Sequence, residues 1–153
     1  MDQESTQQII AAFEKGSQES LVGRMGITIT DASAERVTGS MPVEGNTQPY
    51  GLLHGGASCV LAETLGSLGA ALHAGPGRIT VGLEISATHH RAAAHGEVTG
   101  VATRLHGGRT ITTYEIVISD EQGRRVCTSR LTCLIRDRVP AGGHDPAAAR
   151  TPG

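Results

Sequence analysis

Aromatic side chains are nearly absent from this sequence, which contains one phenylalanine, two tyrosines and no tryptophan. Single-stranded nucleic acids are commonly bound by stacking on such rings, so the chain offers them few platforms. Charge of one sign is not in excess either, because the formal net charge is −2 and the isoelectric point is about 6.4. These absences argue against a nucleic-acid partner or a general binder of polyanions.

Cysteine pairs with redox or metal-ligand spacing are missing as well. Cys59, Cys127 and Cys133 form no CxxC motif, and each lies in an apolar run typical of small buried side chains. The N-terminal segment has no basic region followed by a long apolar run, and no stretch reaches about 18 uninterrupted apolar residues. We therefore predict a reduced cytoplasmic protein without a membrane partner.

The spacing of apolar residues predicts two helices and six strands. A packing helix is expected over residues 5–19, a hairpin over 26–43 and a long helix over 55–73. Alternation then predicts four strands in a meander, over residues 79–87, 96–105, 110–119 and 125–136. The fold class is therefore α+β, with one antiparallel sheet of about six strands wrapped on the long central helix.

These elements fit one domain of residues 1–136, in which residues 1–20 hold the N-terminal packing helix. The tail of residues 137–153 is rich in proline, glycine and alanine and is predicted to be disordered. A single sheet with one core helix leaves a sheet edge and a helix face uncovered. We therefore predict a homodimer.

The long helix has two patterned faces. One is a stripe of leucines at positions 61, 65, 68 and 72, and the second combines Gly56, Cys59, Gly66 and Ala70 with Glu63. The strand that follows alternates with Ile79, Val81, Leu83, Ile85 and Ala87, which are expected on one side of the sheet.

Glu63 is the only charged residue between Gly45 and Gly77. A carboxylate in apolar surroundings loses hydration, so its pKa should rise and it could act as a base or a nucleophile. An exposed position on the rim of the helix accounts for the same residue equally well. Cys59, on the same face, should be an unreactive packing residue beside this carboxylate, and Ser67 could hold Glu63, orient a water or simply pack.

The start of the long helix could stabilise an oxyanion. Gly55 and Gly56 open the helix, where unpaired N–H groups and the positive end of the dipole meet a ligand, and Gln48 and His54 precede it. Glu63 lies about 12 Å along the axis from Gly55. If both act on one carbonyl, they should come from two subunits across a two-fold axis.

A further polar cluster lies at strand ends and loops, where antiparallel neighbours could bring two segments together. The residues are His89, His90 and Arg91 in one segment and His106, Gly107, Gly108, Arg109 and Thr110 in the other. They could form a phosphate-binding patch, and solvated loop side chains are an equally weighted alternative. Zinc is not expected, since adjacent strand residues point to opposite faces and no further ligand shows the required spacing.

Three stretches, QPYGLLHGGASCVLAETLGS, VGLEISATHHR and SRLTCLI, resemble the hotdog-fold acyl-CoA thioesterases. The similarity runs from about residue 22 to residue 136. It is closest to the branch that contains 4-hydroxybenzoyl-CoA thioesterases, the proofreading thioesterase of enterobactin synthesis and the 1,4-dihydroxy-2-naphthoyl-CoA thioesterase of menaquinone synthesis.

The resemblance implies active sites between two subunits, dimers that pair into tetramers, and CoA as part of the substrate with no other cofactor and no metal. It implies a catalytic set of Glu63, Gln48, His54, Gly55 and Ser67. In this set Glu63 is the base or nucleophile, Gln48 and the Gly55 N–H polarise the thioester carbonyl, His54 lies near the leaving thiolate or supports the loop, and Ser67 assists the water. It implies a CoA-binding set of Gly82, His89, His90, Arg91, Ala92, His106, Gly107, Gly108, Arg109, Thr110 and Ile111.

The expected activity is hydrolysis of CoA thioesters, with aryl groups such as benzoyl, hydroxybenzoyl or 1,4-dihydroxy-2-naphthoyl favoured. Alternatives are a non-catalytic acyl-CoA-binding protein in the same groove and a proofreading thioesterase acting on acyl-carrier-protein thioesters. A hydratase of enoyl thioesters ranks last, because the Asp and His pair of that branch is not found. Apolar pockets distinguish acyl groups of similar size by a binding free energy of only about 1 to 3 kcal/mol. The sequence therefore does not identify the acyl group.

Overall fold

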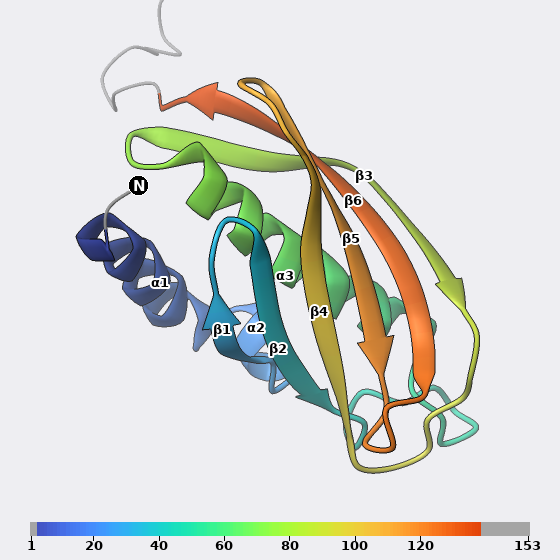
Figure 1. Ribbon diagram of the computed structural model, residues 1–153. Helices are drawn as coiled ribbons and strands as arrows, with labels where there is room; N and C mark the ends of the chain where they lie inside the picture. The colour runs from blue at the N-terminus through green and yellow to red at the C-terminus, as the bar shows by residue number, and fades with distance from the viewer. Residues whose placement is uncertain (1–2, 139–153) are drawn as a thin grey trace, which may run out of the picture.

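In the computed structural model, which describes residues 3–138, six strands form one antiparallel sheet that curves around a central helix (Figure 1). The elements are α1 (Gln3–Ser17), α2 (Leu21–Arg24), β1 (Thr28–Ala32), β2 (Arg36–Pro42), α3 (Gly55–Ala74), β3 (Arg78–His89), β4 (Glu97–Gly107), β5 (Ile111–Ser119) and β6 (Arg125–Asp137). The predicted helix over 5–19 is thus followed by a second short helix, and the long helix and the hairpin are confirmed. Of the tail expected to be disordered, Asp137 ends β6, and residues 139–153 lie outside the described residues.

The strand order is β1-β2-β4-β5-β6-β3, so the predicted meander of four strands is wrong for β3. β3 lies at the far edge beside β6, and β2 takes the place next to β4. That pairing sets Val37 opposite Ala102 and Met41 opposite Val98, and all four side chains are buried. The β2–β4 register therefore aligns two apolar faces over the helix, which the order of strands in the sequence does not reveal.

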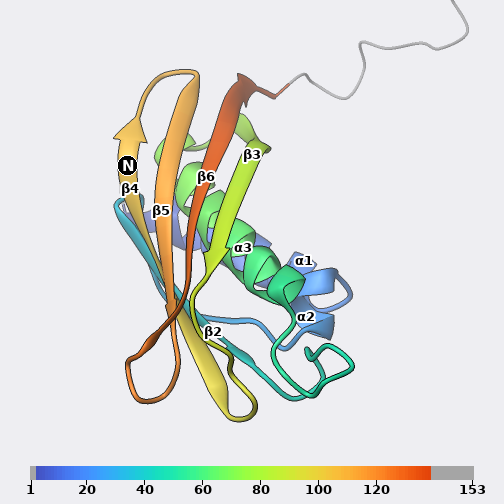
Figure 2. The same ribbon diagram turned by 90° about the vertical axis from the view of Figure 1, so that its right-hand side faces the viewer.

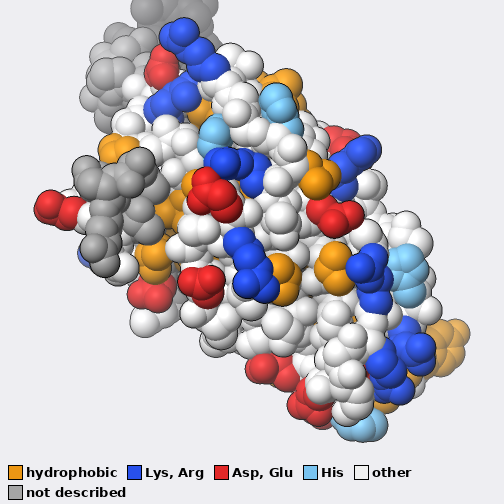
Figure 3. All heavy atoms as spheres, viewed as in Figure 1, with side chains coloured by type: hydrophobic (Ala, Val, Ile, Leu, Met, Phe, Trp, Pro, Cys, Tyr) orange, Lys and Arg blue, Asp and Glu red, His pale blue; other side chains and the backbone are white. Residues whose placement is uncertain are grey.

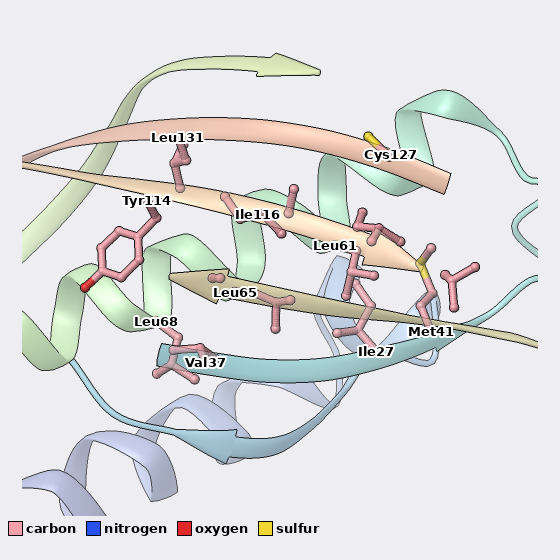
Figure 4. Close-up of a cluster of buried hydrophobic side chains, with 14 of the residues drawn as sticks. Ile27, Val37, Met41, Leu61, Leu65, Leu68, Tyr114, Ile116, Cys127 and Leu131 are labelled. Carbon is pink, nitrogen blue, oxygen red and sulfur yellow. The ribbon is translucent and has the colours of Figure 1, made fainter. Parts of the chain in front are cut away.

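Figure 2 shows α3 lying against the inner face of the sheet. The buried side chains of the core lie between these two layers. The four leucines of the predicted stripe are buried, and Figure 4 shows Leu61, Leu65 and Leu68 directed toward side chains of the strands. Gly69 lets Tyr114 pack directly on the helix, because an added Cβ would stand 2.7 Å from Tyr114 Cε1. Gly66 admits Leu131 at the same distance. Gly66 and Ala70 are buried under the sheet, whereas Glu63 is exposed. The residues expected to form a second face of the helix therefore do not all lie on one side.

β3 contains a bulge between Gly82 and Glu84, so the prediction that its five apolar residues share one side is wrong. Ile79 and Val81 lie opposite Arg136 and Leu134, whereas Ile85 lies opposite Leu131, which faces the core. An extra residue in a strand shifts the alternation by one position. As a result, Ile79, Val81 and Leu83 are 43%, 48% and 55% exposed.

By length and composition alone α3 could cross a membrane, with a mean hydropathy of 1.2 over 18 residues. Its leucines are buried under the sheet, which accounts for this composition. The outer face of the sheet is different, because Figure 3 shows cationic and anionic side chains interspersed across it. Glu115 and Arg130, for example, are opposite one another on β5 and β6.

Candidate functional site

The loop before α3 is a fixed turn. The Gly51 N–H donates to the Gln48 carbonyl at 2.9 Å, and the Gln48 N–H donates to the Leu52 carbonyl at 2.8 Å. Gly51 has a φ of 77°, which favours glycine. The Asn46 side-chain amide donates to the carbonyls of Met25 and Pro42, both at 2.8 Å, and ties the loop to the body of the protein. The local sequence thus holds Gln48 in a defined place beside the helix.

His54 caps the N-terminus of α3. Its Nδ1 accepts a hydrogen bond from the Gly56 N–H at 2.8 Å, so Nδ1 carries no proton and the neutral ring carries its proton on Nε2. The Ala57 and Ser58 N–H groups donate to the His54 carbonyl. The Gly55 N–H donates to no acceptor within residues 3–138. Gly55 therefore offers a free donor at the positive end of the helix dipole.

A cavity of about 440 Å³ opens at this end of the molecule. It is lined by Gln48, Leu52, Leu53, Gly55, Ser58, His89, His90, Arg91, Ala92 and Val126. The His89 ring covers Gly55 closely, because a Cβ on Gly55 would stand 2.9 Å from His89 Nε2. Two of the predicted groups, the helix start and the 89–92 segment, thus share one cavity.

The loop that carries His90 and Arg91 is attached to β6. The N–H groups of both residues lie within hydrogen-bond distance of the Val126 carbonyl, at 2.8 and 3.3 Å. His90 Nε2 lies 2.9 Å from Thr128 Oγ1, which also accepts from Arg125 at 3.2 Å. These contacts place histidine and arginine side chains at the mouth of the cavity.

Glu63 does not line this cavity. Its side chain is exposed, so the expected apolar surroundings are absent from a single chain. The carboxylate lies beside Gly82 on the edge strand β3, where an added Cβ would be 3.1 Å from Oε1. Ser67 lies one turn further along the helix beside the Cys133 thiol, whose pKa is raised by burial. The structure thus brings Glu63 and Gly82 together and leaves Glu63 apart from Gln48 and Gly55.

The two segments of the predicted phosphate patch lie at opposite ends of the sheet, so one chain does not bring them together. His89 is opposite Cys127 on β6, whereas Ile111 is opposite Leu134. Those two β6 residues are seven positions apart, which is roughly 23 Å. The expectation failed because the end of an antiparallel strand lies beside the start of its neighbour. The end of β3 therefore lies far from the β4–β5 hairpin, and pairing with β4 would have separated the two segments in the same way.

The β4–β5 hairpin contains the second predicted segment, and three consecutive carbonyl groups fasten it to the body. The Gly108 oxygen lies 3.0 Å from His73 Nε2, the Arg109 oxygen accepts from Arg78 at 2.9 Å, and the Thr110 oxygen accepts from the Ile135 N–H at 2.7 Å. The sequence did not indicate His73 or Arg78, because neither is near residues 106–111 in the chain. Within residues 3–138, no three His, Cys, Asp or Glu side chains are grouped so that they could hold a metal ion.

Comparison with known proteins identifies the fold and the reaction class. Residues 50–127 match the family model described as Thioesterase superfamily. The chain belongs to this superfamily. It is 50% identical over 127 residues to the proofreading thioesterase EntH of Cronobacter sakazakii, an alignment that covers 82% of this chain and 93% of that protein.

Two solved structures are also similar to this thioesterase. A thioesterase from Haemophilus influenzae matches with a TM-score of 0.78 and 38% identity, and covers 86% of this chain and 94% of its own. A variant thioesterase from Pseudomonas aeruginosa matches with a TM-score of 0.80 and 38% identity, over 84% and 94% of the two chains. The hotdog fold implied by the resemblance is confirmed, and the protein is a thioester hydrolase.

Proposed function

We propose that this thioesterase hydrolyses CoA thioesters of aryl acids, giving the free acid and CoA, at sites formed by two protomers. The observation that carries the proposal is the separation of the two half-sites. Gln48 and the free Gly55 N–H face a cavity, whereas Glu63 is exposed eight residues further along α3, about 12 Å along the helix axis. Neither half alone supplies both an oxyanion donor and a base.

A two-fold dimer built on the edge of β3 would close this gap. Within one chain, Gly55 lies beside His89 and Glu63 lies beside Gly82. If two α3 helices pack antiparallel with the axis midway between residues 55 and 63, Glu63 meets the partner's Gly55. The two β3 strands then pair antiparallel with Gly82 opposite the partner's His89. The helix and the strand support the same arrangement.

The surfaces that such a dimer would cover are available. Within residues 3–138, β3 has a neighbour on one side only, and three of its apolar side chains are exposed. The adjacent face of α3 is open or half-buried and consists mostly of small residues, namely Gly56, Cys59, Val60, Glu63, Ser67 and Ala71. Antiparallel pairing of β3 would also place the β4–β5 hairpin of one protomer near the 89–92 segment of its partner. We include the pairing of two dimers into a tetramer in this proposal.

The proposed chemistry uses each half-site once. Gln48 and the Gly55 N–H hold the thioester carbonyl oxygen as negative charge develops on it. Glu63 either removes a proton from the attacking water or attacks the carbonyl carbon itself. The C–S bond then breaks, and the thiolate leaves readily. In the nucleophilic route the acyl group remains on Glu63 as an anhydride, which water hydrolyses to release the acid and restore the carboxylate. The Nε2–H of His54 can donate to the departing sulfur because Nδ1 is engaged in the helix cap.

We assign the CoA nucleotide to histidine and arginine side chains from both protomers. His90 and Arg91 border the cavity of one protomer, and the partner's Arg109 lies in the hairpin that the dimer brings alongside. Arginine forks and backbone N–H groups suit phosphates. In this proposal the enzyme binds its substrate through the CoA group. We also propose that it acts in the cytoplasm. Menaquinone synthesis is one candidate process.

A second candidate is release of acyl groups from a carrier protein, which the 50% identity to a proofreading thioesterase favours. The pantetheine arm and thioester are common to both substrates, so the same catalytic residues would serve. A thiol-release assay with benzoyl-, 1,4-dihydroxy-2-naphthoyl- and aliphatic CoA thioesters and with acyl-carrier-protein thioesters separates the candidates. Fastest turnover of aryl CoA thioesters supports the main proposal. Preference for the carrier-protein thioester favours proofreading, and binding without thiol release would overturn catalysis.

A further inference from the structure

His73 lies where the last turn of α3 meets the β4–β5 hairpin, and each nitrogen of its ring has a partner. Nδ1 lies 2.9 Å from a guanidinium nitrogen of Arg104, and Nε2 lies 3.0 Å from the Gly108 carbonyl oxygen. A guanidinium only donates, so Nδ1 accepts and Nε2–H donates. Both hydrogen bonds therefore require one form of the side chain, the neutral ring with its proton on Nε2.

The partners of His73 are themselves held. Arg104 forms an ion pair with Glu35 at 3.0 Å, and its backbone N–H donates to the Glu35 carbonyl at 2.9 Å. Gly107 leaves room for the ring, since an added Cβ would stand 2.8 Å from His73 Cε1. A chain of contacts thus runs from the β1–β2 turn through Arg104 and His73 to the tip of the hairpin.

This chain of contacts determines which way the hairpin peptides face. The Gly108 carbonyl points inward to His73 and the Arg109 carbonyl points to Arg78. In a trans peptide the C=O and the following N–H point in opposite directions. The N–H groups of Arg109 and Thr110 therefore point outward, and neither donates to an acceptor in the described part of the chain. Outward N–H groups beside an arginine side chain are donors suited to an anion.

We propose that His73 is a positioning residue for the nucleotide end of the substrate. By holding the Gly108 carbonyl inward, it directs the Arg109 N–H toward the phosphates of CoA. This inference rests on the proposed function, because it takes CoA as the ligand of the hairpin. His73 contacts the hairpin and not the thioester, so it acts on substrate binding and leaves the chemical step unchanged.

The test compares two thioesters of one acid, benzoyl-CoA and benzoyl-N-acetylcysteamine, which lacks the nucleotide. In His73→Ala, loss of the hydrogen bond to Gly108 should raise KM for benzoyl-CoA about tenfold with kcat nearly unchanged. Kinetics with benzoyl-N-acetylcysteamine should stay as in the wild type. His73→Gln keeps one donor and one acceptor, so it should restore most of the affinity for benzoyl-CoA.

The matched control is His95→Ala, which removes an exposed histidine outside the proposed site and should leave both substrates unaffected. Unfolding temperatures of all variants show whether the fold is retained. Equal losses on both thioesters in His73→Ala and His73→Gln would reduce His73 to a structural residue and overturn the inference. Unchanged KM for benzoyl-CoA in His73→Ala would do the same. Failure of the wild type to hydrolyse benzoyl-CoA would instead overturn the proposed function, and the inference with it.

Discussion

The Glu63 carboxylate lies against Gly82, where a methyl group would stand 3.1 Å from Oε1. Glu63 belongs to the central helix and Gly82 to the edge strand, directly before the bulge at residue 83. The absence of a side chain at residue 82 leaves space for the carboxylate on the open face of the molecule. This contact fixes the position of the proposed base relative to the edge at which two protomers would meet.

Gly82→Ala should therefore lower kcat by about tenfold, because a misplaced catalytic group is costly even at a fraction of an ångström. The added methyl group forces Glu63 to shift by a few tenths of an ångström. Thiol release from benzoyl-CoA measures the effect, with Gly16→Ala as the control because nothing lies within 4 Å of its added Cβ. Full activity in Gly82→Ala would show that the observed position of Glu63 is not the reactive one.

Mixing two inactive variants tests the shared site. Glu63→Gln and Gln48→Ala should each be inactive alone, whereas their heterodimer contains one site with both substitutions and one intact site. After unfolding and refolding together in equal amounts, about one quarter of wild-type activity should return, since half the dimers are mixed and each has one working site. A mixture that stays inactive while forming mixed dimers would place both residues in the site of one chain.

His54 is expected to have two separable roles. His54→Asn keeps an oxygen that can cap the helix but removes the Nε2–H, so the protein should keep its stability and lose turnover. His54→Ala should lose turnover and also about 1 kcal/mol of unfolding free energy, because the Gly56 N–H loses its acceptor. Urea unfolding and kcat separate the roles. Normal turnover in a stable His54→Asn would exclude the ring as a donor.

Alkaline pH should destabilise the fold through buried acids, among them Tyr114 and Cys127. Burial raises the pKa of Tyr114 from 10.0 to about 12 and that of Cys127 from 9.0 to about 11. Because the folded state favours the neutral forms, their contribution to stability is complete below about pH 9 and is lost as the pH rises to about 12. The free energy of unfolding should fall across this range.

The Tyr114→Phe variant tests whether ionisation of Tyr114 causes the loss of stability at alkaline pH. It should flatten the fall in unfolding free energy above pH 10, since the ionising group is gone. At neutral pH the variant should be about 1 kcal/mol less stable, because the Tyr114 hydroxyl donates to the Ala34 carbonyl at 2.6 Å. An unchanged pH dependence would assign the alkaline transition to other groups.

The parts of the fold that depend on local pattern could be predicted from the sequence. The leucine stripe determines α3, and its predicted end at residue 73 differs from the observed end by one residue. The glycines and His54 that open the helix were found from the same short stretch. Local spacing is informative there because helix hydrogen bonds and caps join residues a few positions apart.

The parts of the fold that depend on pairing between distant segments could not be predicted from the sequence. Nothing near β3 in the sequence shows that it pairs with β6. The antiparallel course of the strands places His89 and Arg109 at opposite ends of the sheet. One bulged residue reverses the alternation that the pattern assumes. The contact between His73 and Gly108 joins residues 35 positions apart and leaves no local signal.

The two edges of the sheet differ in a way that bears on how far assembly proceeds. β1 is 5 residues long and irregular between Ile29 and Asp31, with α1 residues beside it, whereas β3 runs for 12 residues. A protein with two long open edges could add copies at both and grow into a fibre. With β1 short and irregular, the proposed pairing through β3 would use the one long open edge in the described chain, and assembly would then stop at a closed oligomer of defined size.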